Sequence, residues 1–315
     1  MTLQVIKPGL QTTLQGAPYS GHRHLGMPAA GAADCFSLAL ANNLVGNAPD
    51  AVALEMTLDD AKFAAMHPLA FAVSGAASFL RINGEDKPTY VSVSAKPGDE
   101  IHIGSADRGC RSYLAISGAI ESQTLLSGQS TYLAASLGGF HGRALQVGDV
   151  VKCTPDGRSV NRGKKIPDDL RPIMSGKYLI RVTAGPEYSQ LDDESQIRLF
   201  ANKYKAGTRI NRMGISLNNG NLETTNALHM KSAPVFPGTI QCPPDGVPFL
   251  LGPDAQTTGG YPRIAQVIRA DRHLIGQVRS GSEIQFVMTS NERATEIYRQ
   301  KLSLLAPMLG IESLW

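Results

Sequence analysis

A short phrase recurs three times in this chain and constrains the fold more than any other feature. In each copy a glycine turn directly precedes an apolar, strand-like run. The copies are Lys96–Ile101, Gln146–Val151 and Arg279–Ile284. A turn-and-strand unit that recurs without a regular period is typical of a β-barrel or β-sandwich, and it argues against a solenoid.

The composition agrees with a mainly β fold that carries a few helices. The 315 residues include 32 glycines and 19 prolines, and only 18% are charged. Many turn formers and few charges favour short strands over long helices. Further strands are predicted at Met1–Pro8, Phe71–Gly75, Tyr90–Ser94, Arg111–Ile116, Tyr178–Val182 and Glu283–Val287.

Three helices are expected from their capping signals. The first begins after Asp34, a good N-cap residue, and ends before Gly46. The second begins near Asp192. The third is C-terminal, where Thr289 and Glu292 have the spacing of a capping box. Its apolar face would contain Ala294, Ile297, Tyr298, Leu302 and Leu305.

A chain of this length predicts about two domains. Residues 154–176 are polar, basic and contain Pro and Gly, so we place the boundary there. We expect an N-terminal β-barrel lobe at 1–160, a linker at 161–176, and a C-terminal β-barrel lobe with a C-terminal helix at 177–315. The basic residues at this boundary are expected to be solvated; they are Arg158, Arg162, Lys164 and Lys165.

Charge and apolar patterning exclude several classes of function. The net charge is +3 and no basic block is interleaved with aromatic residues, so no nucleic-acid partner is expected. No apolar run approaches a membrane span and the N-terminus lacks a signal core, so we expect a cytoplasmic protein with no membrane partner. The cysteines are far apart, which supports neither a metal site nor a disulfide framework; they are Cys35, Cys110, Cys153 and Cys242.

The most chemically varied stretch is Asp254–Ala265. Two strand-like runs flank it, Pro248–Leu251 before and Ile264–Ile268 after. The stretch is either a hairpin connection whose glycines serve the turn, or a polar loop that presents a binding site. If Gly259 and Gly260 serve a site, they allow positive φ and close approach of a ligand to the backbone. Residue types alone leave both interpretations open.

Three other segments carry candidate chemistry. In Asn211–Gly214, Arg212 has a planar fork that can hold a carboxylate or an amide carbonyl, although residue type alone favours a surface arginine with a packed stem. Glu187 would matter if it faces the same cleft as Arg212. The glycine-rich stretch Leu137–Arg143 either exposes N–H groups to an anion or forms a long loop over a barrel mouth.

Taken together, these segments resemble the allophanate hydrolase subunit 2 family. That family includes the C subunits of 5-oxoprolinases and the KipA proteins, and its relatives form part of the carboxyltransferase region of urea carboxylase. The resemblance covers essentially the whole chain. The matching residues are Gly31, Ala32, Asp34, Ala41–Asn42, Leu44–Asn47, Leu54–Glu55, Arg111–Ala115, Ser130–Thr131, Gly138–Gly139, Gly142–Arg143, Gly185–Tyr188, Asn211–Gly214, Pro237–Gln241 and Asp254–Ala265.

The resemblance implies two cyclophilin-like β-barrel lobes and a hydrolase subunit that acts on a cyclic amide. With a KipI-like partner, which is the B subunit of such enzymes, and a third subunit, the protein would open the lactam of 5-oxoproline to L-glutamate at the expense of ATP. The chain has neither a phosphate-binding P-loop nor a fitting biotinyl lysine, so we expect no covalently bound cofactor here and ATP on the partner subunits. Two alternatives remain: a carboxyltransferase component of a biotin-dependent urea or amide carboxylase, and a KipA-like regulatory protein without catalysis.

The leading interpretation also assigns roles within the second lobe. Arginine forks and glycine N–H groups would hold a carboxylate or the developing negative charge, and an acid or a phenol would transfer protons. Replacing Arg212 with alanine is then expected to abolish activity without unfolding the chain. The catalytic candidates are Asp254, Tyr261 and Arg212. The substrate-binding candidates are Arg263, Gln256, Thr257, Thr258, Gly259, Gly260, Glu187 and Asn211.

The chain departs from the family pattern in the first lobe. An Asp-Gly-Gly-Arg-like run is usual where this chain has Gln15–Gly21, so the motif is altered at Gly16–Ser20. An aspartate usually follows Ser-Thr, where this chain has Tyr132. These changes predict altered specificity or reduced activity.

Overall fold

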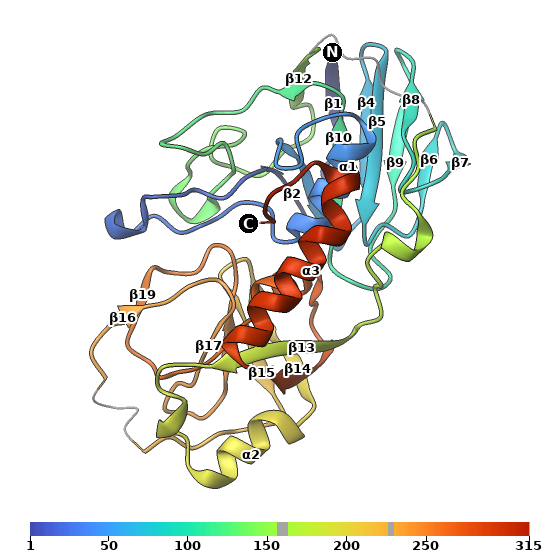
Figure 1. Ribbon diagram of the computed structural model, residues 1–315. Helices are drawn as coiled ribbons and strands as arrows, with labels where there is room; N and C mark the ends of the chain where they lie inside the picture. Colours follow the sequence, from blue (N-terminus) through green and yellow to red (C-terminus); the bar gives the residue numbers. More distant parts are fainter. Residues whose placement is uncertain (156–162, 226–229, 315) are drawn as a thin grey trace. The chain divides into compact units, whose positions relative to one another are not determined.

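The computed structural model describes residues 1–155, 163–225 and 230–314. The chain forms two compact units that are interleaved along the sequence (Figure 1). Unit 1 contains residues 1–19, 34–174 and 305–315, and unit 2 contains residues 20–33 and 175–304. The lobes expected from the sequence are continuous, so the boundaries differ at residues 20–33 and 305–315.

Local contacts explain both differences. In unit 2 the peptide N–H of Ala30 donates to the carbonyl of Pro253 at 2.8 Å, which ties segment 20–33 to that unit. In unit 1 the Asn43 side chain donates to the carbonyl of Met308 at 2.7 Å. Leu305 and Leu309 are buried as well.

The expected linker, residues 161–176, is packed from Gly163 onward. The Gly163 N–H donates to the carbonyl of Ser92 at 3.1 Å, and the Ile166 N–H donates to that of Tyr90 at 3.0 Å. The Ile166 side chain is buried, and the Lys164 ammonium donates to the carbonyl of Asn43 at 2.8 Å. Residues 163–174 therefore belong to unit 1, and residues 175 and 176 belong to unit 2. Arg158 and Arg162 lie outside the described residues.

Unit 1 contains two antiparallel sheets that enclose one apolar core. The seven-stranded sheet has the order β11 (Ala119–Ile120), β12 (Val150–Thr154), β1 (Thr2–Lys7), β4 (Ala61–Ala65), β9 (Glu100–Ile103), β6 (Leu80–Ile82) and β7 (Glu85–Lys87). The five-stranded sheet has the order β2 (Gln11–Gln15), β3 (Ala53–Thr57), β10 (Arg111–Ile116), β5 (Leu69–Gly75) and β8 (Val93–Ala95). Two short 3₁₀ helices, η2 (Leu133–Ala135) and η3 (Asp168–Leu170), belong to this unit.

Unit 2 is a closed seven-stranded barrel. Its order is β13 (Lys177–Ala184), β20 (Arg263–Val267), β17 (Thr239–Gln241), β18 (Phe249–Leu251), β15 (Gly214–Asn218), β14 (Tyr204–Asn211) and β21 (Glu283–Met288). A small sheet pairs β16 (Ala233–Pro234) with β19 (Thr258–Gly259). The 3₁₀ helices η1 (Arg23–Leu25), η4 (Tyr188–Gln190) and η6 (Arg269–Gln277) complete the unit. The mainly β prediction is confirmed, and the closed barrel is seen in unit 2.

The helices begin where side chains cap them. α1 (Cys35–Leu44) packs against β5 and β10, and the Asp34 carboxylate accepts from the Ser37 N–H at 2.9 Å. α2 (Asp193–Ala201) has the same bond from Ser195 to Asp192, at 2.7 Å. Both predicted caps are confirmed.

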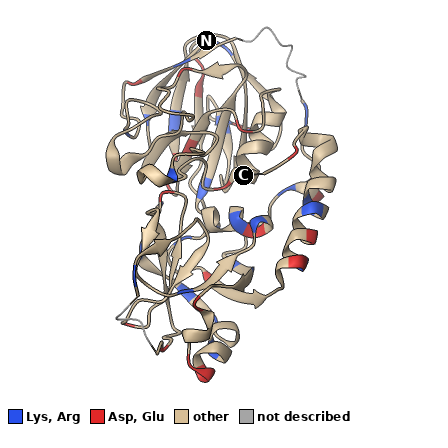
Figure 2. Cartoon of the chain, turned by 60° about the vertical axis from the view of Figure 1, so that its left-hand side comes forward, with Lys and Arg blue, Asp and Glu red and all other residues tan. Residues whose placement is uncertain are grey.

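The cap of α3 (Asn291–Leu309) differs from the prediction by one residue. The Ser290 hydroxyl accepts from the Arg293 N–H at 3.1 Å. Thr289 does not serve as the cap, because its N–H still pairs with Val182 on β13. Figure 2 shows both acidic and basic residues along this helix.

All three predicted turns precede strands, namely β9, β12 and β21. Their glycines, Gly98, Gly148 and Gly281, have φ of 88°, 88° and 83°. A fourth copy precedes β17, where Gly238 has φ 89°. In each copy the side chain after the glycine accepts from the N–H three residues before it: Asp99 from Lys96, Asp149 from Gln146, Thr239 from Phe236 and Ser282 from Arg279.

The predicted strand Tyr90–Ser94 is wrong in its first half. Tyr90 has φ of 58°, in the left-handed region, and its hydroxyl accepts from the Gly75 N–H at 2.9 Å. The strand β8 begins only at Val93. A tertiary contact therefore overrides the β propensity of this run.

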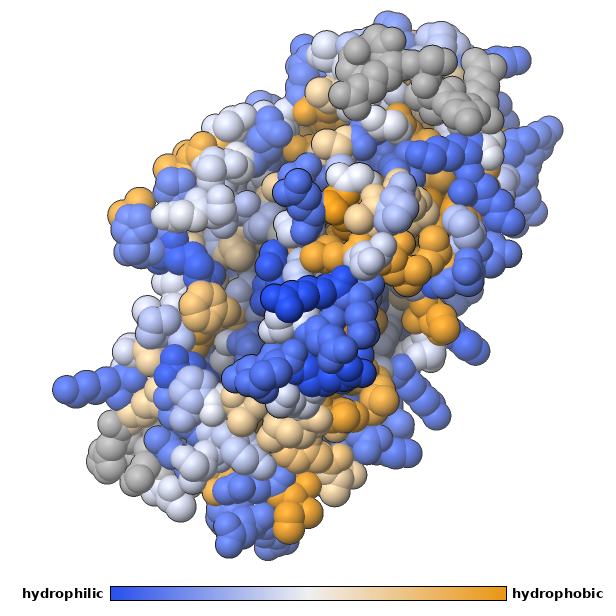
Figure 3. Space-filling view, viewed as in Figure 1, coloured by the Kyte–Doolittle hydropathy of each residue, from blue (hydrophilic) through white to orange (hydrophobic). Residues whose placement is uncertain are grey.

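Polar residues cover most of the face shown in Figure 3, with apolar residues exposed between them. Among the described residues, the helices lack the combination of length and apolarity that crossing a membrane requires.

Candidate functional site

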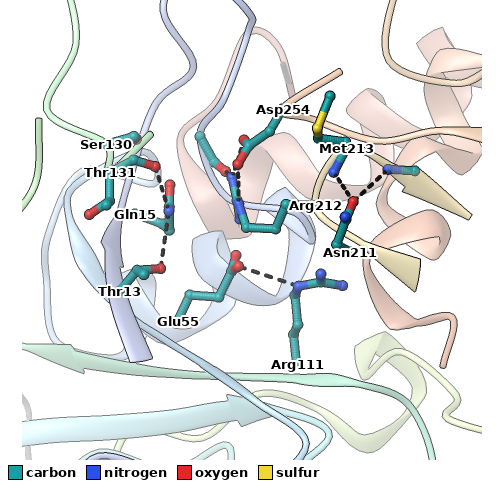
Figure 4. Close-up of polar contacts among 12 residues, drawn as sticks. Thr13, Gln15, Glu55, Arg111, Ser130, Thr131, Asn211, Arg212, Met213 and Asp254 are labelled. Atoms are coloured by element: carbon teal, nitrogen blue, oxygen red, sulfur yellow. Dashed lines mark hydrogen bonds and ion pairs between the residues drawn. The ribbon is translucent and has the colours of Figure 1, made fainter. Parts of the chain in front are cut away.

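A buried ion pair lies at the turn between β14 and β15. Arg212 donates from Nε to Asp254 Oδ2 and from Nη2 to Asp254 Oδ1, both at 2.8 Å (Figure 4). Each side chain is only 5% exposed. Nη2 also donates to the carbonyl of Gly31 at 2.5 Å. Arg212 is therefore neither a surface arginine nor a free cation.

Backbone contacts place this pair. The Asp254 N–H donates to the carbonyl of Arg212 at 3.0 Å. A Cβ at Gly252 would lie 2.4 Å from the same carbonyl oxygen, so only glycine allows this approach. Asn211 Oδ1 accepts from the N–H of Met213 at 2.8 Å and from that of Gly214 at 3.3 Å, and it thereby shapes the turn.

A second ion pair joins Glu187 to Arg263, at the start of β20. Arg263 Nε donates to Oε2 at 2.7 Å and Nη2 donates to Oε1 at 2.6 Å. The Arg263 peptide N–H adds a bond to Oε2 at 3.0 Å. Hydrogen bonds from Arg263 lower the pKa of the Glu187 carboxyl below its usual value. Glu187 thus pairs with Arg263 and not with Arg212.

The residues between these two pairs form loop 255–262. Part of it is the strand β19, which pairs with β16, and the Val235 N–H donates to the carbonyl of Thr257 at 3.0 Å. The Gln241 amide donates to the carbonyl of Tyr261 at 3.2 Å and accepts from the Gln256 amide at 3.3 Å. The loop therefore contributes one strand to a short two-stranded sheet and is held by Gln241, so it is not a tight hairpin.

Glycines 259 and 260 do not adopt positive φ, which corrects the expectation for this pair. A Cβ at Gly259 would lie 2.7 Å from Gln241 Nε2, so a larger residue there would require the Gln241 amide to shift. Gln256 and Thr258 are exposed, and Tyr261 is 45% exposed. The exposed polar groups of this region thus lie between the two ion pairs.

Unit 1 has a buried polar cluster to which the sequence analysis gave no role. The Tyr113 hydroxyl donates to Glu55 Oε2 at 2.7 Å and accepts from the Asp34 N–H at 2.8 Å. Arg111 Nε lies 3.3 Å from Glu55 Oε1 (Figure 4). Burial raises the pKa of Tyr113 well above its usual value. The sequence feature that could have indicated this cluster is a glutamate and an arginine within otherwise apolar strand segments.

The altered first-lobe motif begins with a buried amide. Gln15 is 0% exposed, and its Nε2 donates to Thr13 Oγ1 at 3.1 Å and to the carbonyl of Thr131 at 3.0 Å (Figure 4). Its Oε1 has no hydrogen-bond partner among the described residues.

Two further residues of this motif, Gly16 and Tyr19, form hydrogen bonds with Ser130. The Gly16 N–H donates to the Ser130 hydroxyl at 2.9 Å, and the Tyr19 hydroxyl donates to the Ser130 carbonyl at 2.7 Å. Tyr132 follows at the start of η2, and its N–H donates to the carbonyl of Leu137 at 2.8 Å. Gly16, Tyr19 and Tyr132 are therefore held in unit 1 by neutral hydrogen bonds, whereas Ser20 belongs to unit 2.

In the part of the chain that the structure describes, His, Cys, Asp and Glu side chains form no group of three that could hold a metal ion. The four cysteines, all in described segments, are buried and form no disulfide.

The fold is that of a carboxyltransferase domain. The family model for "Carboxyltransferase domain, subdomain A and B" matches residues 25–288, and the chain belongs to this family. It is 35% identical over 292 residues to the C subunit of the 5-oxoprolinase of Escherichia coli, covering 93% of each chain. It is 30% identical over 312 residues to the urea amidolyase of Saccharomyces cerevisiae, covering 94% of this chain and 17% of that protein.

A solved structure agrees with the sequence relatives. The urea amidolyase of Kluyveromyces lactis matches with a TM-score of 0.91 and 28% identity, over 100% of this chain and 20% of that one. The family relationship expected from the sequence motifs is therefore confirmed.

Proposed function

We propose that this chain is a subunit of an ATP-dependent 5-oxoprolinase, which opens the lactam of 5-oxoproline to L-glutamate. The observation that carries the proposal is the 35% identity to the C subunit of a 5-oxoprolinase over 93% of both chains. The match to the urea amidolyase covers 17% of that much longer protein. We further propose a KipI-like partner, corresponding to the B subunit of such an enzyme, and a third subunit, with ATP bound on those chains.

Opening a lactam requires a group that polarises the carbonyl and a group that transfers a proton. Loop 255–262 supports both roles, because its exposed part has the Tyr261 hydroxyl together with amide and threonine groups. The Arg212–Asp254 pair lies immediately before the loop and the Arg263–Glu187 pair immediately after it. We assign the loop to substrate contact and the two pairs to positioning, since groups held rigidly lose less entropy on binding.

Two assignments change as a result. Asp254 already shares both carboxylate oxygens with Arg212. A carboxylate engaged in this way is a poor proton acceptor, because the adjacent guanidinium favours its charged form. Tyr261 is therefore the better candidate for proton transfer.

Reconstitution tests the proposal. The purified chain is combined with the KipI-like partner and the third subunit of the same organism, and release of phosphate and of L-glutamate is measured. We expect ATP hydrolysis that depends on 5-oxoproline, requires all three proteins and is insensitive to avidin. A complete complex that binds 5-oxoproline but never releases L-glutamate contradicts the proposal.

The same assay separates the alternatives. The TM-score of 0.91 to a urea amidolyase favours biotin-dependent carboxylation as the second candidate. Activity that requires urea or another amide and is blocked by avidin identifies that reaction. A stable complex with no turnover on either substrate identifies a KipA-like regulatory role.

A further inference from the structure

A pocket of about 490 Å³ opens on unit 1, away from loop 255–262 in the chain and built only from residues of this unit. One wall consists of the segment Glu121–Gln123, which follows β11, and the exposed face of β12, and the other is part of the glycine-rich stretch Leu137–Arg143. The proposed function gives this pocket no role.

The strand wall carries both signs of charge. Val150 and Lys152 are exposed on β12, alternating with the buried Val151 and Cys153. The Glu121 N–H donates to the carbonyl of Lys152 at 2.9 Å, which places the two residues opposite each other. Opposed residues of antiparallel strands project from the same face. Glu121, Lys152 and Val150 therefore form one surface.

The loop wall has an unusual backbone. Gly139 and His141 have φ of 54° and 52°. A Cβ at Gly139 would lie 1.9 Å from Thr131 Oγ1, so the position accepts only glycine. Within residues 1–155, 163–225 and 230–314, the N–H groups of Phe140 and His141 donate to no backbone carbonyl. Such N–H groups are available to an anion, which is one of the two interpretations that the sequence leaves open for this stretch.

The two walls are connected and the base between them is apolar. The Gln123 N–H donates to the carbonyl of Gly139 at 2.8 Å, which fixes the distance between the strands and the loop. Phe140 packs against the core of unit 1 and lines the pocket together with Val150.

We infer that this pocket binds a free α-amino acid as a zwitterion. The Lys152 ammonium and the loop N–H groups bind its carboxylate, the Glu121 carboxylate binds its ammonium, and Phe140 and Val150 contact its hydrocarbon part. The arrangement supplies each charge with a partner of opposite sign, which is the condition for holding a zwitterion against an apolar base.

Calorimetric titration of the full-length chain with L-glutamate tests the inference, with 5-oxoproline as the second probe because it lacks the ammonium group. We expect saturable binding of L-glutamate and at least fivefold weaker binding of 5-oxoproline. Lys152→Ala should weaken L-glutamate binding about tenfold, since it removes one charge-assisted hydrogen bond. Val150→Trp should abolish binding by filling the pocket.

Lys96→Ala is the matched control, because Lys96 is an exposed lysine of the same unit outside the pocket. It should leave the affinity unchanged, and thermal melts check that all variants are folded. Equal binding of both probes, no saturation with L-glutamate, or full affinity in either pocket variant overturns the inference. Because the titration uses this chain alone, it stands or fails independently of 5-oxoprolinase turnover.

Discussion

Arg212 and Asp254 form an ion pair that is almost completely removed from solvent. Removing one member of such a pair leaves the other charge buried without a partner, which costs about 3–5 kcal/mol. Arg212→Ala should therefore lower the free energy of unfolding by that amount in urea denaturation. We therefore expect Arg212→Ala to lose stability as well, and not activity alone as the sequence suggested.

Arg212→Lys is the matched variant, because it keeps the charge and loses the second parallel bond. The fall in the free energy of unfolding should be clearly smaller for Arg212→Lys than for Arg212→Ala. Equal stability of Arg212→Ala and the unsubstituted chain would contradict the role of the pair.

Tyr261 is the residue whose substitution should affect turnover without affecting stability. Its side chain is 45% exposed, so Tyr261→Phe removes a hydroxyl and little packing. We expect at least a tenfold fall in kcat of the reconstituted complex, toward the range of about 10²–10⁴ that acid–base groups contribute. Tyr298→Phe, a hydroxyl deletion on α3, should leave kcat unchanged. Full activity of Tyr261→Phe would exclude proton transfer by this residue.

The stability that the second ion pair contributes should depend on pH, because Glu187 must be ionised. Its pKa is lower in the folded chain than its usual value of 4.5, chiefly through hydrogen bonds from Arg263. A depressed folded pKa stabilises the fold above the unfolded pKa, and this stabilisation is lost as pH falls through the folded pKa. Stability should therefore decline below about pH 4.5, and less steeply in Glu187→Gln. Identical acid profiles of the two proteins, followed by circular dichroism, would contradict this.

At the scale of elements, the four glycine turns start strands in both units. Gly281 has φ of 83° and nothing within 4 Å of an added Cβ, so its substitution tests backbone conformation alone. Gly281→Ala should cost about 1–2 kcal/mol, because residues with a Cβ disfavour left-handed backbone. Gly281→Asn should cost less, as asparagine tolerates that region. Chemical denaturation measures the free energy of unfolding of both variants. An unchanged value for Gly281→Ala would show that the turn relaxes to another conformation.

Local signals predicted elements well, and nonlocal contacts explain the errors. The caps at Asp34 and Asp192 act within one turn of helix, so the sequence alone identifies them. Tyr90 leaves the strand because of Gly75, and Gly259 packs against the Gln241 amide; no local pattern reveals either contact. The pairing of Arg212 with Asp254 depends on strand approach at Gly252. Residue types therefore predicted which loop is polar, and the fold decided which of its charges are already paired.

At the scale of the whole molecule, family motifs predicted the barrel class and the relatives, and composition predicted a boundary segment that contains the division at residues 174 and 175. Residues 154–176 look like a linker because they are polar, yet Gly163 and Ile166 hydrogen-bond to the backbone of unit 1 and residues up to 174 belong to that unit. Residues 305–315 follow the second unit in sequence and still belong to the first.

This interleaving predicts the effect of a truncation. Ending the chain at Leu304 removes the buried side chains of Leu305, Leu309 and Leu314 and the bond from Asn43 to Met308. Hydrogen exchange should accelerate in α1 and β10 while the barrel strands of unit 2 keep their protection. Equal acceleration in both units, or none in unit 1, would contradict the assignment of this segment.

The same arrangement affects the order in which the two units can fold during translation. A ribosome makes a chain from its N-terminus, and domains usually fold as they emerge. Here residues 305–315 of unit 1 are translated after every residue of the barrel. Unit 2 can therefore complete its structure before unit 1 does, although most of unit 1 is made first. A chain interrupted before residue 305 would therefore contain every residue of unit 2 but lack the segment that completes unit 1.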